Sequence, residues 1–161
     1  MLCRRHGLAY AASAQASQAT DLFRKDMQDT LHQLTWVALG SAVGGPARFF
    51  LSGLVGRRVG ETFAWGTLTV NVTGCFAIGL LAAAASVDGL LPLASFWPCA
   101  VTGFLGGYTT VSSFSLQTLA MVRDGEILRA GANVLLSLGL CLAAVALGFA
   151  AGAALFGTGT P

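Results

Sequence analysis

The residues most able to do chemistry lie together in the run from Gly106 to Ser115. The run reads Gly-Gly-Tyr-Thr-Thr-Val-Ser-Ser-Phe-Ser and interrupts an otherwise apolar stretch with glycines and hydroxyl side chains. Unwound polar backbone is tolerated at membrane depth only where it lines a cavity or is buried in protein. The run therefore predicts a helix that is broken from Gly106 to Thr110 and that forms an ion or substrate site.

Two amide side chains add to this polar set from other apolar segments. Asn71 lies in the segment Gly66–Gly74, and Asn133 lies four residues before Ser137, so that Asn133 and Ser137 share one helical face. An asparagine offers two N–H donors, which suit an anion, although hydrogen bonding between helices is an equally open role for Asn71. Polar residues within a membrane usually face a bundle interior or a water-filled path.

No acidic residue accompanies these donors, and this separates the possible transport mechanisms. Proton and cation paths generally need a carboxylate within the membrane, whereas hydroxyl, amide and aromatic-edge donors can solvate a small anion. Phe114, among the serines, can supply such an edge, although packing is the commoner role of a phenylalanine. Arg48 can bias a vestibule toward anions or can extend to the membrane interface.

The composition places the chain in a membrane. Hydrophobic residues make up 55% of 161 positions and charged residues 10%, a balance that ordinary soluble domains do not show. A spanning helix needs roughly 20 mostly apolar residues. Four windows qualify and predict an all-α membrane protein with four transmembrane helices, at about 34–55, 65–86, 96–122 and 128–156.

Residues 1 to about 30 differ in character from these windows. They combine charged side chains with the low-complexity stretch from Ala11 to Ser17. We expect weak or no order there, and an equally open alternative is that translation begins at Met27. The transmembrane channel domain is expected over residues 34–156.

The remaining reactive side chains indicate no catalytic or redox site. The four cysteines lack CxxC spacing and are expected to be small apolar packing residues. They are Cys3, Cys75, Cys99 and Cys141. Both histidines lie outside the predicted spans, so no buried His cluster can hold a catalytic metal. Nucleophile-elbow and Walker-type motifs do not occur in the sequence, so we expect neither an enzyme nor a nucleic acid partner.

Small residues recur at a spacing of four. Gly40 and Gly44 form one such pair, and Gly148 and Gly152 form another. This spacing places both glycines of a pair on one helical face and lets backbones approach closely, so it predicts helix packing within the protein.

Three segments resemble a known family, the small bacterial fluoride channels called CrcB or Fluc proteins. Gly44–Arg48 is similar to the Gly/Ala-Arg signature of the family's first helix, Gly66–Gly74 to its GTLxxNxxG segment, and Gly103–Ser115 to its GFxGGxTTFSTFS segment. The third match is highly specific. The resemblance covers all four predicted spans, about Leu34 to Phe156.

The resemblance implies a fluoride-selective passive channel in the cell (inner or plasma) membrane that exports fluoride and confers fluoride resistance. It implies an antiparallel, dual-topology homodimer with two pores along the subunit interface and a structural sodium ion at its centre. Main-chain carbonyls of Gly106 and Thr109 from both subunits would hold the Na⁺. The fluoride path would use Asn71, Ser112, Ser113, Phe114 and Ser137, with Asn133 near a pore-lining position.

Two residues depart from the family pattern. Val111 stands where the motif usually has its first phenylalanine, and Gln117 stands where relatives commonly carry glutamate. We expect fluoride to permeate with an altered rate or blocking behaviour. The Lys and Arg residues near the span ends are balanced and permit dual insertion, but a start at Met27 would fix the orientation and require an oppositely inserted homologue as partner.

Two other function classes compete with the channel. A four-helix multidrug exporter needs a membrane-embedded carboxylate, and the acidic residues outside the N-terminal segment all lie in predicted joints. They are Glu61, Asp88, Asp124 and Glu126. A structural subunit that transports nothing explains the small-residue packing but not the hydroxyls and amides at midspan.

Overall fold

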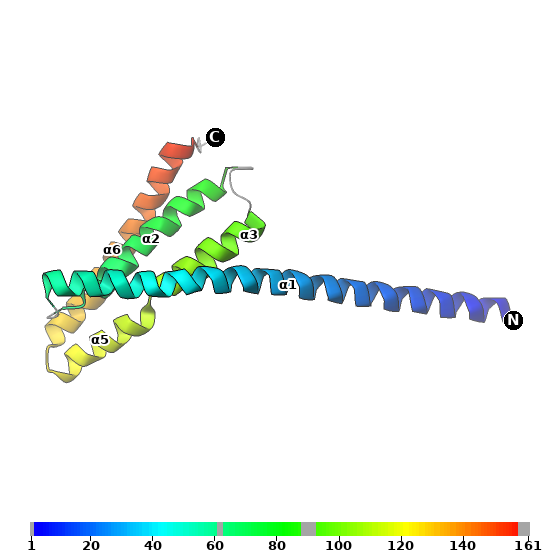
Figure 1. The fold of residues 1–161 in the computed structure, drawn as a ribbon, viewed down its shortest axis with the longest axis horizontal. Helices are drawn as coiled ribbons and strands as arrows, with labels where there is room; N and C mark the ends of the chain where they lie inside the picture. Colours follow the sequence, from blue (N-terminus) through cyan, green and yellow to red (C-terminus); the bar gives the residue numbers. More distant parts are fainter. Residues whose placement is uncertain (1, 61–62, 88–92, 158–161) are drawn as a thin grey trace. The chain divides into compact units, whose positions relative to one another are not determined.

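The computed structural model describes residues 2–60, 63–87 and 93–157, and its regular elements there are all helical (Figure 1). Three helices are long: α1 (Leu2–Val59), α2 (Trp65–Ala85) and α6 (Ile127–Phe156). Between α2 and α6 lie four shorter elements. They are α3 (Leu93–Trp97), the π-helix η1 (Pro98–Leu105), α4 (Gly106–Tyr108) and α5 (Val111–Arg123). The prediction of an all-α chain is confirmed.

Contacts divide the chain into two units, Met1–Thr35 and Trp36–Pro161. The sequence predicted weak or no order for residues 1 to about 30, whereas the structure describes α1 as helical from Leu2. The physical reason is local, because no Gly or Pro interrupts the chain between Gly7 and Gly40 and alanines are frequent there. From residue 20 to residue 35 every side chain is exposed, so helix propensity rather than burial favours this part of α1.

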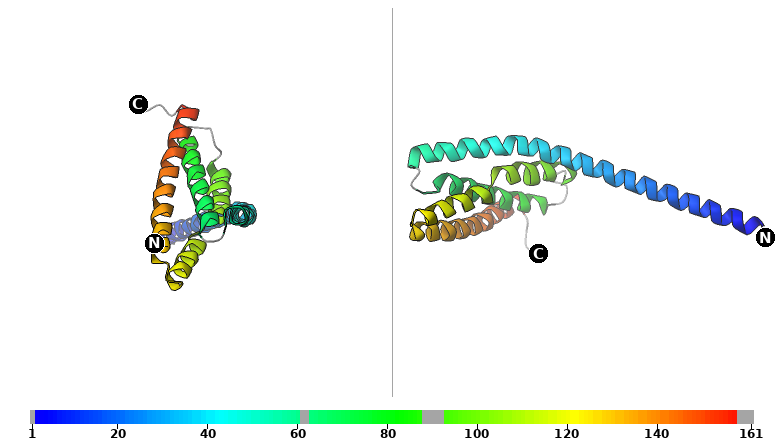
Figure 2. Two further views of the ribbon diagram at one scale, coloured as in Figure 1. Left: turned by 90° about the vertical axis from the view of Figure 1, so that its left-hand side faces the viewer. Right: turned by 90° about the horizontal axis from the view of Figure 1, so that it is seen from below.

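Two of the four predicted spans appear as single helices that are long and apolar enough to cross a membrane, namely α2 and α6. The predicted windows 65–86 and 128–156 match these helices to within one residue at each end. The window 34–55 lies inside α1, and the window 96–122 is divided among α3, η1, α4 and α5. Figure 2 shows the same elements from two further sides.

α2 and α6 pack side by side through glycines (Figure 1). A Cβ placed on Gly79 would overlap the carbonyl oxygen of Val145, and one placed on Gly148 would overlap the carbonyl oxygen of Phe76. Gly152 likewise faces the side chain of residue 83. Residue numbers rise together along both helices at these contacts, so the two helices run parallel. The predicted packing role of Gly148 and Gly152 is confirmed.

The part of α1 after residue 36 packs against η1 in the same way. Gly40 lies against the backbone of Cys99, and Gly44 lies against the carbonyl of Phe104. Both glycines are buried. A Cβ at either position would meet backbone, which cannot move aside as a flexible side chain can, so the predicted packing role of Gly40 and Gly44 is also confirmed.

Candidate functional site

Two threonines in extended conformation separate α4 from α5. Thr109 has φ −77° and ψ 159°, and Thr110 has φ −152° and ψ 124°. Thr110 is buried, and its hydroxyl accepts a hydrogen bond of 3.2 Å from the Ser113 N–H, which caps the N-terminus of α5. Gly106–Tyr108 is helical, so the non-helical backbone between residues 106 and 110 consists of the two threonines.

Asn71 of α2 binds the backbone of Thr110 at two points. Its Nδ2 donates to the Thr110 carbonyl at 3.0 Å, and the Thr110 N–H donates to its Oδ1 at 2.8 Å. Buried backbone groups outside a helix need such partners. α2 comes this close because Gly74 has no side chain, and a Cβ there would overlap the methyl group of Thr109. One N–H of the Asn71 amide is left for another acceptor.

Because of these hydrogen bonds, the N–H groups of Thr110 and Ser113 do not donate to the carbonyls that they would bind in a continuous helix. There the Thr110 N–H would donate to the Gly106 carbonyl and the Ser113 N–H to the Thr109 carbonyl, because α-helical bonds join residue i to residue i−4. Instead the two amides donate to Asn71 and to the Thr110 hydroxyl. The main-chain oxygens of Gly106 and Thr109 thus lose these helical donors, and hard cations take oxygen ligands of this kind.

Metal binding by side chains has no comparable basis in the part of the chain that the structure describes. No group of three or more His, Cys, Asp or Glu side chains gathers there. A cation at this site would therefore depend on main-chain oxygens.

A polar cavity of about 170 Å³ lies beside Thr110. The residues that line it come from α1, α2, α5 and the turn before α5. They are Arg48, Phe49, Ser52, Thr67, Val70, Thr110 and Ser113. Its polar side chains are one guanidinium and four hydroxyls, and no carboxylate of the described residues lines it. The Thr110 hydroxyl donates to the Ser113 hydroxyl and the Ser52 hydroxyl to the Phe49 carbonyl, so Arg48, Thr67 and Ser113 are the donors left for a bound ion. Such a lining suits an anion.

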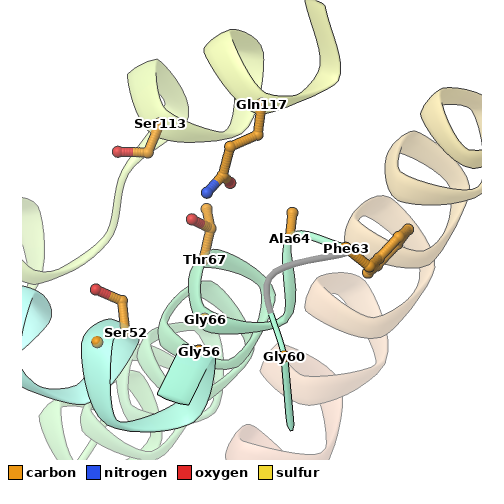
Figure 3. A pocket seen from close by; sticks show the side chains of 10 residues that line it. Ser52, Gly56, Gly60, Phe63, Ala64, Gly66, Thr67, Ser113 and Gln117 are labelled. Atoms are coloured by element: carbon orange, nitrogen blue, oxygen red, sulfur yellow. The ribbon is translucent and has the colours of Figure 1, made fainter. Parts of the chain in front are cut away.

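A second cavity, of about 430 Å³, shares Ser52, Thr67 and Ser113 with the first and extends to Gln117. Figure 3 shows the Gln117 amide extending toward Thr67 from α5. Gln117 also lines a third cavity, of about 310 Å³, at the turn between α5 and α6. Glu126 lines that third cavity and forms a 2.6 Å ion pair with Arg129. Asp124 and Glu126 thus line the third cavity, whereas no carboxylate of the described residues lines the first two.

The predicted fluoride-path residues fall into two groups. Ser113 lines the first two cavities. Ser112 and Asn71 line none of the three, but both contact Thr110. The Ser112 hydroxyl oxygen is 3.1 Å from the Thr110 hydroxyl oxygen, and Asn71 bonds to the Thr110 backbone. The remaining predicted residues line none of the three cavities. They are Val111, Phe114, Asn133 and Ser137.

Asn133 has a clear role within this protomer. Its side chain is 1% exposed, and its Nδ2 donates to the Thr118 hydroxyl at 2.8 Å, which joins α6 to α5. The Asn133 Oδ1 is buried without a hydrogen-bond partner. Val111, in contrast, is 76% exposed, so nothing in one protomer covers the position that departs from the family motif.

Sequence reasoning missed three hydroxyls that line the small cavity, those of Ser52, Thr67 and Thr110. A signal for two of them exists in the spacing. Ser52 follows Arg48 by four residues and Thr67 precedes Asn71 by four residues, so each pair shares a helical face. Thr110 was predicted only as part of the helix break.

Comparison with known proteins identifies relatives over most of the chain. The model of the family described as CrcB-like protein, Camphor Resistance (CrcB), matches residues 35–149. A protein of Rhodopseudomonas palustris (strain BisB18), named fluoride-specific ion channel FluC 2, is 63% identical over 126 residues, which cover 78% of this chain and 96% of that protein. A protein of the same name from Bradyrhizobium diazoefficiens is 58% identical over 114 residues, 70% of this chain and 83% of that protein.

A third relative, named fluoride-specific ion channel FluC, from Opitutus terrae, is 55% identical over 114 residues, 70% of this chain and 86% of that protein. The family match contains the three motif segments and all the cavity-lining residues described above. It begins at residue 35, so residues 1–34 lie outside the match. The chain belongs to the family of CrcB-like proteins.

Proposed function

We propose that this protein is a fluoride-specific passive ion channel, not an enzyme. The observation that carries the proposal is the small cavity beside Thr110, whose polar lining consists of hydroxyls and the Arg48 guanidinium, with no carboxylate from the residues that the structure describes. The ion comes from the relatives, which are named fluoride-specific ion channels. The cavity chemistry independently favours an anion over a proton or a metal cation.

The physical task of such a channel is to replace the water around a strongly hydrated anion. Moving a bare charge into an apolar medium costs many kcal/mol, and hydrogen-bond donors along the path offset that cost. Ser113 and the free N–H of Asn71 are such donors. Neutral donors bind an anion less tightly than a cationic side chain would, which lets the ion leave as well as enter. Arg48, at the cavity wall, raises the local concentration of anions.

The proposed fluoride path runs from the Ser113 side of the cavity past Ser112 and the edge of Phe114 to Ser137 on α6. Asn133, one turn before Ser137, is buried and donates to Thr118, so its place is beside this path. Flow is passive, because the sequence has no nucleotide-binding motif. Fluoride enters a cell as the neutral acid HF and leaves through the channel as the anion, down its electrochemical gradient. The cellular result is fluoride resistance.

We further propose that the Gly106 and Thr109 carbonyls hold a structural sodium ion together with the same two groups of a second subunit. These carbonyls suit a sodium ion because the hydrogen bonds at the helix junction engage the N–H groups that would bind both carbonyls in a continuous helix. Sodium would supply a fixed positive charge between the subunits and would hold the two junctions together. Asn71 positions the carbonyl-bearing backbone from outside this site.

The second subunit is proposed to be an antiparallel copy of this chain or an oppositely inserted homologue, in a multi-pass arrangement in the cell membrane. Most of the apolar surface of α2 and α6 is uncovered in one protomer, because 11% of the most apolar window of α6 and 33% of that of α2 are buried. Lipid and a partner must cover the rest. Thiol labelling of a single loop cysteine from both sides of the membrane supports dual topology, whereas labelling from one side only excludes it.

The experiment that tests the channel is fluoride efflux from liposomes that contain the purified protein, followed with a fluoride electrode. We expect rapid efflux once a potassium ionophore collapses the membrane potential, and little chloride efflux under matched conditions. Protein-free liposomes give the leak rate. Well-folded protein that releases no fluoride above this leak would refute the proposed function.

A further inference from the structure

Two thiols meet where α2 and α6 pack together. Cys75 lies on α2 and Cys141 on α6, both are half-buried, and both are free cysteines. Their side chains lie close enough to interact. This contact brings within reach two sulfur atoms that lie 66 positions apart in the chain, and no local motif in the sequence indicates it.

The backbone around the thiols favours a short link between the helices. Gly79 lies one turn beyond Cys75 and packs against the carbonyl of Val145, which lies one turn beyond Cys141. Because α2 and α6 run parallel, equal steps along both helices keep the same partners together. A disulfide needs Cα atoms about 4.4–6.8 Å apart, and only helices in close backbone contact offer such a separation.

We propose that Cys75 and Cys141 form a redox site, in which oxidation joins the two thiols by a disulfide within one chain and links α2 to α6. Two S–H bonds break and one S–S bond forms. The two electrons and two protons pass to hydrogen peroxide, whose O–O bond breaks to give two molecules of water. A thiol reductant reverses the reaction by exchange.

A disulfide between Cys75 and Cys141 would lie close to the proposed fluoride path. Asn71 lies one turn before Cys75, and Ser137 lies one turn before Cys141. The disulfide therefore fixes the register of α2 against α6 one turn from the two helix positions that belong to the proposed fluoride path. The redox site itself does not rest on the proposed function, because its test requires no ion flux.

The chain offers a direct test, because Met121 lies between the two cysteines and cyanogen bromide cuts after methionine. The full chain carrying Cys3→Ser and Cys99→Ser is purified in detergent and treated with diamide. Diamide takes up the two thiol hydrogens across its N=N bond and leaves the methionine thioether intact. We expect fragments 28–121 and 122–161 to stay joined after diamide and to separate after dithiothreitol.

The matched control adds Cys141→Ser to the same background and should release both fragments under every condition. Wild-type protein gives a second measurement that is independent of the substitutions, since intact-mass analysis should show the loss of two hydrogens per chain and a peptide that links Cys75 to Cys141. Fragments that separate after diamide would overturn the proposal. A joined product whose mass before cleavage is that of two chains would also overturn it.

Discussion

The sharpest prediction concerns the Asn71 side chain, which holds the junction between α4 and α5. In Asn71→Leu, a side chain of similar size replaces the amide and removes both hydrogen bonds to Thr110, of 3.0 and 2.8 Å. Thr110 is 7% exposed, so water cannot readily take the place of the lost partner. The substitution therefore leaves one buried N–H and one buried carbonyl unpaired.

The magnitude follows from these two groups. Each orphaned buried backbone group costs about 1–3 kcal/mol, so the double loss lowers the free energy of unfolding by about 2–6 kcal/mol. An alternative relief is for the junction to rewind into continuous helix, with Thr110 N–H donating to the Gly106 carbonyl. That rearrangement would remove an oxygen from the proposed sodium site. Either outcome should reduce fluoride efflux to near the leak rate.

The assay pairs thermal denaturation in detergent with fluoride efflux in liposomes. Thr73→Val is the matched control, because Thr73 lies two residues further along α2 and its exposed hydroxyl bonds to the Tyr108 hydroxyl at 2.8 Å. This loss should cost about 1 kcal/mol or less and leave efflux unchanged. If Asn71→Leu denatures and conducts like wild type, or if Thr73→Val is the more damaging change, the assignment of Asn71 to the junction is refuted.

Three further predictions follow from single positions. Gly44→Ala places a Cβ against a main-chain oxygen of η1 and should destabilise the fold by about 1–3 kcal/mol. In Gly45→Ala the new Cβ meets open space, so this variant should be neutral or stabilising by up to about 1 kcal/mol. Thermal denaturation that ranks the two variants the other way contradicts the packing described for α1. Val111→Phe restores the usual aromatic residue and should change the rate of fluoride efflux, and an unchanged rate would show that Val111 is not the cause of any altered conduction. Arg48→Gln should lower the rate of fluoride efflux up to about tenfold at low ionic strength, and by less in high salt. Arg48→Lys keeps the positive charge and should retain most of the efflux rate. An Arg48→Gln variant that conducts like wild type at low salt contradicts the vestibule role.

The sequence predicted the elements that depend on local composition and periodicity. The apolar windows located α2 and α6, and the glycine spacing located the close contacts of Gly40, Gly44, Gly148 and Gly152. The N-terminal part of α1 was not predicted, because low complexity and charge indicate disorder while the absence of Gly and Pro between Gly7 and Gly40 allows helix. Local patterns cannot decide between these two states where burial gives no help, as in residues 20–35, which are all exposed.

The contacts that form the site join residues far apart in the sequence, and no local pattern predicts such contacts. Asn71 and Thr110 are 39 residues apart, and the polarity of Asn71 alone left its role open between anion binding and helix contact. The structure assigns the acceptor oxygen and one N–H of that amide to Thr110, which answers half of the question. Ser52 and Thr67 could have been found from their four-residue spacing to Arg48 and Asn71, but a hydroxyl at that spacing is too common in a sequence to single out.

The hydrogen bonds at the junction bear on the proposed second subunit, because they decide which donors one protomer has left for an ion. With one N–H of Asn71 given to Thr110 and the Thr110 hydroxyl donating to Ser113 at 3.3 Å, the donors left near the junction are the second Asn71 N–H and the Ser113 hydroxyl, together with Ser112 when it turns away from Thr110. The Arg48 guanidinium and the Thr67 hydroxyl add donors on the cavity side. Val111, next to the junction, is 76% exposed, so nothing within one protomer covers it. The proposed antiparallel partner would cover Val111 and would bring the edge of its own Phe114 to the same path as a further donor.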